Sequence, residues 1–346
     1  MNSTVYSSRL LATVQTVQLV SAIYLAILGI VQVISNALLL FTIFRDPFKT
    51  LRLPATLFIA SLSLADLLTG FLANSLISWY LLSKIYALTF NEVMVQVGDV
   101  VSGITVTVSN ATVLAISWVQ LISITYPYKY RKIVTSKSIG ISVICIWLYA
   151  LIFSLLQLTS VQHVAVRLAD LFINYTALLV AFMVTYVLLY LRFRRQIYLT
   201  RSNGVLGMNS VKFQRTFYIA NLILLSLHLG CTIPHSVDLY FTFYGDLISL
   251  EERLWHSTAK LVIYDVLFLK FSLNVLVYAW RLPKYRNAFR EALCNGCRIV
   301  EPTCHVTTNG PIIRYIGESV VLTSYTVWHP FASVVMDTGN HIQQIT

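Results

Sequence analysis

Seven long apolar segments dominate this sequence and limit the folds that it can adopt. They cover residues 17–44, 54–82, 94–126, 139–161, 170–192, 213–240 and 257–280. An α-helix needs about 20 consecutive apolar residues to cross a bilayer, and each segment reaches that length. Charged residues make up only 11% of the chain, whereas soluble domains carry about 25%. The sequence therefore predicts an all-α membrane protein, with a seven-transmembrane helix bundle over residues 17–280.

The third and seventh segments are the most polar of the seven. The third contains Asp99 and several Ser, Thr and Asn residues between positions 102 and 112, and the seventh contains Asp265 and Lys270. Polar and ionisable side chains at membrane depth face other helices or water-filled space. We therefore expect the polar sides of these two helices to face the interior of the bundle.

Positive charge is distributed unevenly between the two sides of the predicted bundle. Nineteen of the 25 Lys and Arg residues lie on the side of the bundle that holds the connections at 45–53, 127–138 and 193–212 and the tail after the seventh span. Cytoplasmic connections carry such an excess, so we expect a plasma-membrane protein with an extracellular N-terminus (1–16) and a cytoplasmic tail (294–346). The formal charge of +11 then borders the inner leaflet, which favours membrane lipids over nucleic acid as a partner.

A short amphipathic segment follows the seventh span. In RLPKYRNAFREAL, residues 281–293, the side chains of Leu282, Tyr285, Phe289 and Leu293 share one helical face, and the basic residues lie elsewhere. This pattern predicts an eighth helix that lies on the inner leaflet.

The five cysteines do not form a disulfide framework. Cys294 and Cys297 directly follow the amphipathic segment, where palmitoylation would attach it to the membrane. A zinc site that adds Cys304 and His305 is the alternative, but the segment offers only one histidine and no second pair of ligands. We expect acylated or free thiols and no metal. No outward connection contains a cysteine, which excludes an extracellular disulfide. Asn2 begins an Asn-Ser-Thr sequon and is a candidate glycosylation site.

Seven short motifs occur in order between residues 18 and 295. They are Asn36 in VISNALLLF, LRLPATLFIASLSLADLL with Asp66, LAIS followed by ITYPYKY, Trp147, Tyr186, CTIP at 231–234 and NVLVY at 274–278. In this order and spacing they resemble the rhodopsin-like (class A) family of G-protein-coupled receptors. The resemblance implies a seven-helix receptor that senses an extracellular ligand and signals through a heterotrimeric G protein or another cytoplasmic partner. It implies no enzymatic activity and no cofactor.

The inner end of the third span departs from this family. The resemblance aligns the Asp-Arg-Tyr motif with Val119, Gln120 and Leu121, and the sixth-helix acid that pairs with the arginine with Gln214. A neutral Gln120–Gln214 amide pair would contribute about half as much as a charge-assisted one, so any resting lock would be weaker. Because Gln120 cannot make the charge-assisted contacts of an arginine, we expect weak or absent G-protein activation. The alternative is that Gln120 bonds only to water. The other switch positions that the resemblance implies are Tyr186 and Tyr278.

Further departures affect the other helices. Thr232 replaces the family's sixth-helix tryptophan, and Val275 replaces the seventh-helix proline. Val95 takes the place of the third-helix cysteine. No proline occurs between residues 170 and 192, so we expect the fifth helix to lack a proline kink.

Asp66 and Lys270 are predicted to lie at the same membrane depth. Counted from Pro54 and Trp280, they lie roughly 18 and 15 Å from the inner face. A lone charge at the bilayer centre costs at least about 2.5–3.5 kcal/mol, so we expect a buried ion pair. The resemblance implies a sodium site at Asp66, Ser109 and polar seventh-helix positions, which here are Lys270 and Asn274. The lysine ammonium would then replace sodium as a tethered cation.

Two other interpretations of this lysine remain open. The ion pair could serve insertion alone, without any role in signalling. Lys270 could instead form a retinal Schiff base, although the equivalent lysine of opsins would lie at Phe268.

Polar residues recur at every third position on the outer parts of two spans, and others mark the seventh. Candidate ligand-pocket residues are Asp99, Ser102, Thr105, Thr232, His235 and Asp265, with Asp238 and Lys260 nearby. Outer acids outnumber outer bases, which favours a cationic ligand, but Ser102 at the family's amine-binding position does not support an aminergic one. The alternative for each residue is helix packing.

Three functions fit these observations. The first is a cell-surface receptor. The second is a receptor-fold protein that no longer couples and acts as a decoy or partner subunit. The third is a carrier or channel in which Asp66 and Lys270 form a gate; the absence of an internal repeat weighs against it.

Overall fold

The computed structural model describes residues 2–45, 54–89, 92–157, 163–202, 208–245, 249–281, 283–293, 313–316 and 319–322. Seven helical spans in this part are long and apolar enough to cross a membrane. They are Leu10–Arg45, Thr56–Ile85, Val93–Thr125, Ser136–Leu156, Ala165–Arg195, Tyr218–Tyr244 and Leu250–Tyr278. The predicted bundle of seven transmembrane helices is confirmed.

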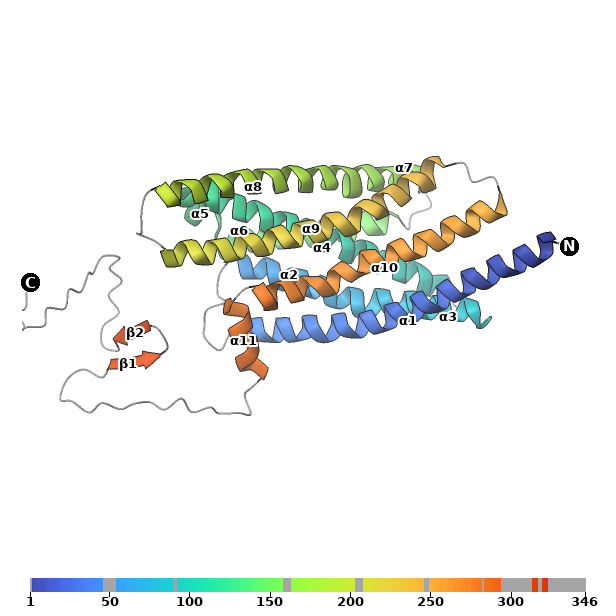
Figure 1. Cartoon of the computed structure of the whole chain (residues 1–346), viewed down its shortest axis with the longest axis horizontal. Coiled ribbons are helices and arrows are strands. Elements are labelled where there is room, and N and C mark those ends of the chain that lie inside the picture. Colours follow the sequence, from blue (N-terminus) through green and yellow to red (C-terminus); the bar gives the residue numbers. More distant parts are fainter. Residues whose placement is uncertain are drawn as a thin grey trace, which may run out of the picture. The chain divides into compact units, whose positions relative to one another are not determined.

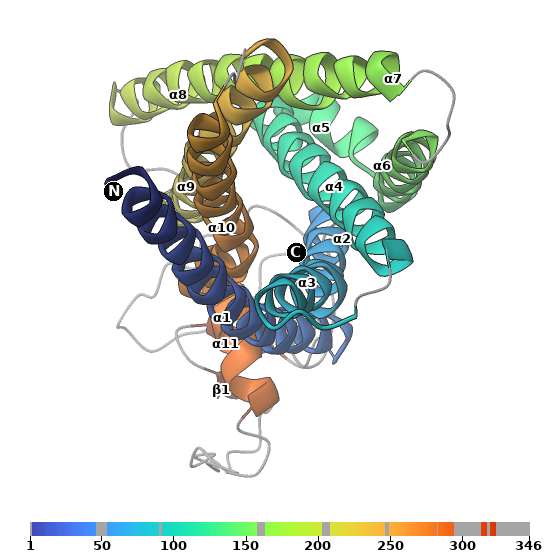
Figure 2. The same ribbon diagram turned by 90° about the vertical axis from the view of Figure 1, so that its right-hand side faces the viewer.

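The bundle lies within one compact unit, Met1–Cys294. Helix α4 (Glu92–Thr125) contacts α2 (Pro54–Leu68), α6 (Ser136–Leu156) and α8 (Leu178–Ser202), and so occupies an inner position (Figure 2). This position agrees with the polar character of the third segment. The described helix α1 begins at Asn2 and continues to Arg45, so most of the predicted N-terminal segment is already helical.

The remaining long helices close the bundle. Helix α9 (Met208–Tyr244) packs between α8 and α10 (Leu250–Arg281), and α10 also packs along α1. Helices α1 and α10 begin, and α3 (Ser75–Ile85) ends, at one end of the bundle, which we call the amino-terminal end; the opposite end carries α11 (Pro283–Leu293) and is called the α11 end (Figure 1).

Two spans contain a π-helical turn. The second consists of α2, η1 (Thr69–Asn74) and α3, and the fifth consists of α7 (His163–Asp170), η2 (Leu171–Ala177) and α8. The fifth span therefore lacks a proline yet is not a regular α-helix. A π-turn inserts an irregularity without proline, and hydrophobic periodicity gave no sign of either one.

Close backbone packing accompanies η1. A Cβ atom added to Gly70 would lie 2.9 Å from the carbonyl oxygen of Gly29 and 2.7 Å from Cβ of Gln32. Only glycine at both positions lets α1 and η1 approach so closely. Gln32 then donates to the carbonyl of Phe268 at 2.8 Å and accepts from Asn74 at 2.9 Å, which ties three helices together.

The outer surface of the bundle is apolar. On α6, the side chains of Ile141, Ile144, Leu148 and Ile152 are exposed. Lipid chains are as apolar as these side chains, so this surface suits a bilayer. On the inner side of α6, Trp147 Nε1 donates to Ser61 Oγ of α2 at 3.0 Å.

Two short helices lie at the α11 end of the bundle. Helix α5 (Pro127–Ile133) follows the third span, with Pro127 at its first position, where a missing N–H has no cost. Burial raises the pKa of the Tyr130 hydroxyl, so this side chain packs as a neutral group. On α11, the Tyr285 side chain is buried and its hydroxyl lies 3.0 Å from Thr56 Oγ1. A helix was expected here; its placement on the inner leaflet stays a prediction.

The tail forms a separate unit, Asn295–Thr346. Its described residues form an antiparallel hairpin of β1 (Ile313–Ile316) and β2 (Ser319–Leu322), in which Ile313 pairs with Leu322. No structure was predicted for this segment.

Candidate functional site

Two charged side chains lie fully buried in the centre of the bundle. Asp66 of α2 and Lys270 of α10 are both 0% exposed. Asp66 accepts from Asn274 Nδ2 at 2.8 Å, and Lys270 Nζ donates to Asn110 Oδ1 at 2.7 Å. Ser109 is also fully buried and lies within electrostatic range of Asp66. The four expected residues Asp66, Ser109, Lys270 and Asn274 therefore share one buried region.

The direct ion pair that we expected between Asp66 and Lys270 is not present. Among the described residues, His256 Nε2 lies 3.1 Å from Asp238 Oδ1, a contact that is an ion pair only when the imidazole is protonated. Each central charge takes an asparagine as its close partner, because an amide oxygen satisfies the ammonium and an amide N–H satisfies the carboxylate. The two charges interact at longer range. Asn110 is the residue that the sequence analysis missed here.

The expected switch positions lie at the edge of the main core. Val119, Leu121 and Tyr186 pack against it, and Tyr278 is buried. Gln120 is only 5% exposed, and its Oε1 accepts no hydrogen bond within the part of the chain that the structure describes. The side chain of Gln214 lies outside the described residues, so the proposed Gln120–Gln214 pair stays a prediction.

A polar contact one turn deeper joins the same two helices. Ser117 Oγ of α4 donates to Asn221 Oδ1 of α9 at 3.2 Å and to the carbonyl of Val113 at 2.8 Å. Both side chains are buried. The third and sixth spans are therefore linked by neutral hydrogen bonds near Gln120.

The candidate ligand residues on α4 and α10 do not gather at one cavity. Ser102 bonds to the carbonyls of Gly98 and Asp99 in its own helix, at 2.8 and 3.0 Å. Asp99 is exposed. Asp265 accepts from Ser21 Oγ of α1 at 2.6 Å, so its carboxylate joins two helices. These contacts agree with the packing alternative for Ser102 and Asp265.

His235 belongs to an aromatic cluster at the amino-terminal end of the bundle. Its ring lies 5.0 Å from the rings of both Tyr175 and Tyr264, and the His235 side chain is 2% exposed. Thr232, one turn away on α9, is 0% exposed. Tyr264 lies within electrostatic range of Asp99, Asp170 and Asp238, which come from three different helices. The sequence analysis named His235 but missed both tyrosines.

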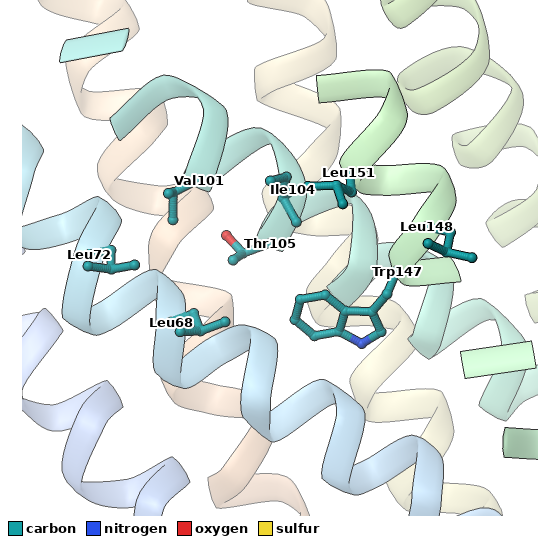
Figure 3. Close-up of a pocket in the computed structure, with 8 residues that line it drawn as sticks. All are labelled: Leu68, Leu72, Val101, Ile104, Thr105, Trp147, Leu148 and Leu151. Carbon is teal, nitrogen blue, oxygen red and sulfur yellow. The ribbon is translucent and has the colours of Figure 1, made fainter. Parts of the chain in front are cut away.

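Thr105 lines an apolar crevice on the side of the bundle (Figure 3). The crevice has a volume of about 240 Å³ and lies between the second, third and fourth spans. Figure 3 shows the Trp147 indole beside it, with Leu68 and Leu72 from the second span on the opposite side. Leu148 and Leu151, which also line it, are 50% and 42% exposed. The crevice therefore faces the membrane.

A second cavity, of about 330 Å³, lies at the amino-terminal end between α1, α3 and α10. Among its lining residues are Gln18, Lys84, Lys260 and Tyr264. Of the six candidate pocket residues, Thr105 lines the first of these two cavities, and the second contains none.

Three predicted modification sites cannot be placed. Cys294 and Cys297 lie outside the described residues, as does the side chain of Asn2. The two cysteines in the described part of the chain, Cys145 and Cys231, are both free.

Comparison with known proteins gives consistent matches. The model of the family described as "7 transmembrane receptor (rhodopsin family)" matches residues 35–243. The chain is 27% identical to melanocortin receptor 5 of Mus musculus over 279 residues, which cover 77% of this chain and 82% of the relative. Its identity to melanocortin receptor 5 of Rattus norvegicus is 26% over 288 residues, 80% of this chain and 84% of the relative. A tachykinin-like peptides receptor of Drosophila melanogaster is 21% identical over 308 residues, 80% of this chain and 59% of the relative.

Proposed function

Because this chain belongs to the rhodopsin family of seven-transmembrane receptors, we propose that it binds its ligand at the amino-terminal end of the bundle and signals at the α11 end. Membership of this family makes it a multi-pass cell-surface receptor and not an enzyme. In the proposed orientation the N-terminus is extracellular and the tail is cytoplasmic. The distribution of Lys and Arg supports this orientation.

The proposed ligand is a positively charged peptide. Three acids on three helices, Asp99, Asp170 and Asp238, lie within electrostatic range of Tyr264 at the amino-terminal end. A cationic group that entered there would be attracted by all three. One relative is named a receptor for tachykinin-like peptides, which supports a peptide as the ligand class.

Coupling is proposed to be weaker than is usual for the family. The observation that supports this proposal is the burial of Gln120, which the family resemblance aligns with the arginine of the Asp-Arg-Tyr motif. An uncharged amide makes hydrogen bonds that contribute about 1 kcal/mol, against about 1.5–3 kcal/mol for bonds to a charged group. A receptor with this substitution forms a weaker contact with a G protein.

The decisive experiment is guanine-nucleotide exchange with a panel of purified heterotrimeric G proteins. Membranes that contain the native chain are compared with membranes from the same cells without it. Weak exchange on one G-protein class is expected. Exchange at ordinary efficiency would contradict the weak coupling, and no exchange on any class would favour the decoy or partner-subunit alternative.

A carrier is the second candidate function. The fully buried Asp66 and Lys270 would favour it, since charges at membrane depth occur in transport pathways. Ion flux through proteoliposomes that contain the purified chain tests it directly.

A further inference from the structure

The cavity between α1, α3 and α10 has a chemical character that the candidate ligand residues do not explain. Its volume, about 330 Å³, lies at the lower end of the range for small-molecule sites, about 300–1,000 Å³. Apolar side chains form its walls, among them Val14 and Leu81, which are buried, and Val17 and Leu261, which are partly buried.

Two lysines lie over aromatic rings of this cavity. Lys84 Nζ lies 5.1 Å from the ring centroid of Tyr80 on α3, and Lys260 Nζ lies 5.8 Å from that of Tyr264 on α10. All four residues line the cavity. Each lysine is four residues from its tyrosine, so the two side chains of each pair lie one helical turn apart on the same face. Because α3 ends and α10 begins at the amino-terminal end, both lysines lie one turn nearer that end than the tyrosines.

This arrangement places two cations in the lining of a partly apolar cavity. None of the ion pairs within the described part of the chain involves Lys84 or Lys260. Asp99 lies within electrostatic range of Lys260 but forms no ion pair with it. A cation–π contact holds the ammonium beside a neutral ring, so the ammonium keeps its charge. Gln18 and Ser257 add neutral hydrogen-bonding groups to the same walls.

We propose that the cavity between α1, α3 and α10 binds an anionic amphiphile, with its acidic group between Lys84 and Lys260 and one hydrocarbon chain along Val14, Val17, Leu81 and Leu261. The acidic group comes from a free carboxylic acid or from the headgroup of an anionic lipid. This site adjoins the region around His235 that is proposed for the cationic ligand, and Tyr264 contributes to both.

A thermal-shift measurement on the purified full chain tests the proposal. The protein is held in phosphatidylcholine nanodiscs, and the probe is octanoate, compared with octanol and with octylammonium at equal concentration. Octanoate is expected to raise the melting temperature by at least about 2 °C at saturation, whereas octanol and octylammonium are not. A second preparation with phosphatidylglycerol in the discs and no octanoate tests the lipid headgroup as the source of the anion.

Variants separate this site from a general effect of charge. Lys84→Met with Lys260→Met is expected to abolish the stabilisation, and Lys84→Glu with Lys260→Glu is expected to transfer it to octylammonium. The matched control is Arg167→Met, which removes an exposed cation on α7 and leaves the octanoate shift unchanged. If a double variant is not recovered as a folded protein, the same measurement is made with single variants of the exposed Lys84.

The outcomes are distinct. A lysine-dependent shift with octanoate identifies a free acid, and a lysine-dependent shift with phosphatidylglycerol alone identifies a lipid headgroup. The proposal is overturned if octanol stabilises as well as octanoate, if the lysine variants keep the full shift, or if neither anion stabilises the native chain. Nucleotide exchange takes no part in this test, so its result is independent of the proposed coupling.

Discussion

Gln120 is the side chain on which the proposed weak coupling depends. It is buried near the carboxyl end of α4, and its Oε1 accepts no hydrogen bond within the described residues. An arginine there would need an acid beside it, since an unpaired buried charge is costly. We predict that Val119→Asp with Gln120→Arg raises ligand-evoked or basal nucleotide exchange by about 2- to 30-fold, because a charged contact adds about 0.5–2 kcal/mol.

The control for this prediction is Gln120→Met, which keeps the length of the side chain without charge. It should leave exchange near the native level. The hypothesis fails if the double variant is folded at the cell surface and exchanges no faster than the native chain.

The buried charges give a second prediction at the residue scale. When the charge of either Asp66 or Lys270 is removed, the other buried charge loses its counter-charge, although it keeps its asparagine partner. We predict that Asp66→Asn and Lys270→Met each destabilise the protein by about 3–5 kcal/mol. The double variant should lose less than the sum by about 1–3 kcal/mol. Melting temperatures of detergent-purified protein measure this cycle.

Two further measurements complete that cycle. Lys137→Met, at an exposed position on α6, is the control and should have little effect. Sodium should not stabilise the native chain if the ammonium takes its place. Strictly additive losses, or clear stabilisation by sodium, would contradict the tethered-cation hypothesis.

Depth along the helices predicted which charges share a layer, but not their partners. Counting residues from the membrane border placed Asp66 and Lys270 together, and both are fully buried. It could not place Asn110, because an amide inside a polar segment gives no signal of the direction in which it points. The intervening asparagines therefore emerged only from the packed structure.

At the scale of single helices, the close approach of α1 and η1 depends on two glycines. A Cβ on Gly29 would lie 2.9 Å from the Gly70 carbonyl oxygen and 3.2 Å from Asn74 Cβ. We predict that Gly29→Ala destabilises the protein by about 1–3 kcal/mol, the range for overpacking, and lowers its melting temperature. Gly140→Ala is the matched control, because a Cβ at Gly140 meets no atom within 4 Å.

In the control, alanine should be neutral or stabilising by up to about 1 kcal/mol, since glycine weakens a helix interior. Equal effects of the two substitutions would show that the Gly29 contact does not matter. The apolar periodicity predicted both helices but not this contact, because a glycine in an apolar run is compatible with packing against lipid or against another backbone.

For the whole molecule, the proposed orientation predicts which connections are glycosylated. Acceptor tags at Ser3 and in the 83–91 and 243–253 loops should be modified, whereas tags at 200–208 and after residue 300 should not. A shift in electrophoretic mobility that a glycosidase reverses is the measurement. Modification at 200–208 would overturn the orientation and the proposed side of ligand binding.

The bundle itself was predictable from length and hydropathy, because each span must satisfy its own backbone hydrogen bonds in lipid. All seven expected segments correspond to helical spans. The cavities were not predictable in the same way. The candidate pocket was inferred from polar residues spaced three apart on separate helices. Only the packed structure shows that Ser102 and Asp265 form hydrogen bonds to other groups of the bundle. The cavity that contains Lys84 and Lys260 is formed by α1, α3 and α10, which are far apart in the sequence and meet only in the folded bundle.

The π-helical turn η1 has a consequence for how this chain is compared with others. A π-turn closes its hydrogen bonds over one residue more than an α-turn, so the second span holds one extra residue between Asp66 and Lys84. Every residue of α3 is thereby rotated by about 100° relative to a continuous α-helix. A relative without that residue would keep the same side chains facing α1 and α10. Its alignment with this chain needs a one-residue gap within 69–74, and a gapless alignment would pair every position of α3 with the wrong neighbour.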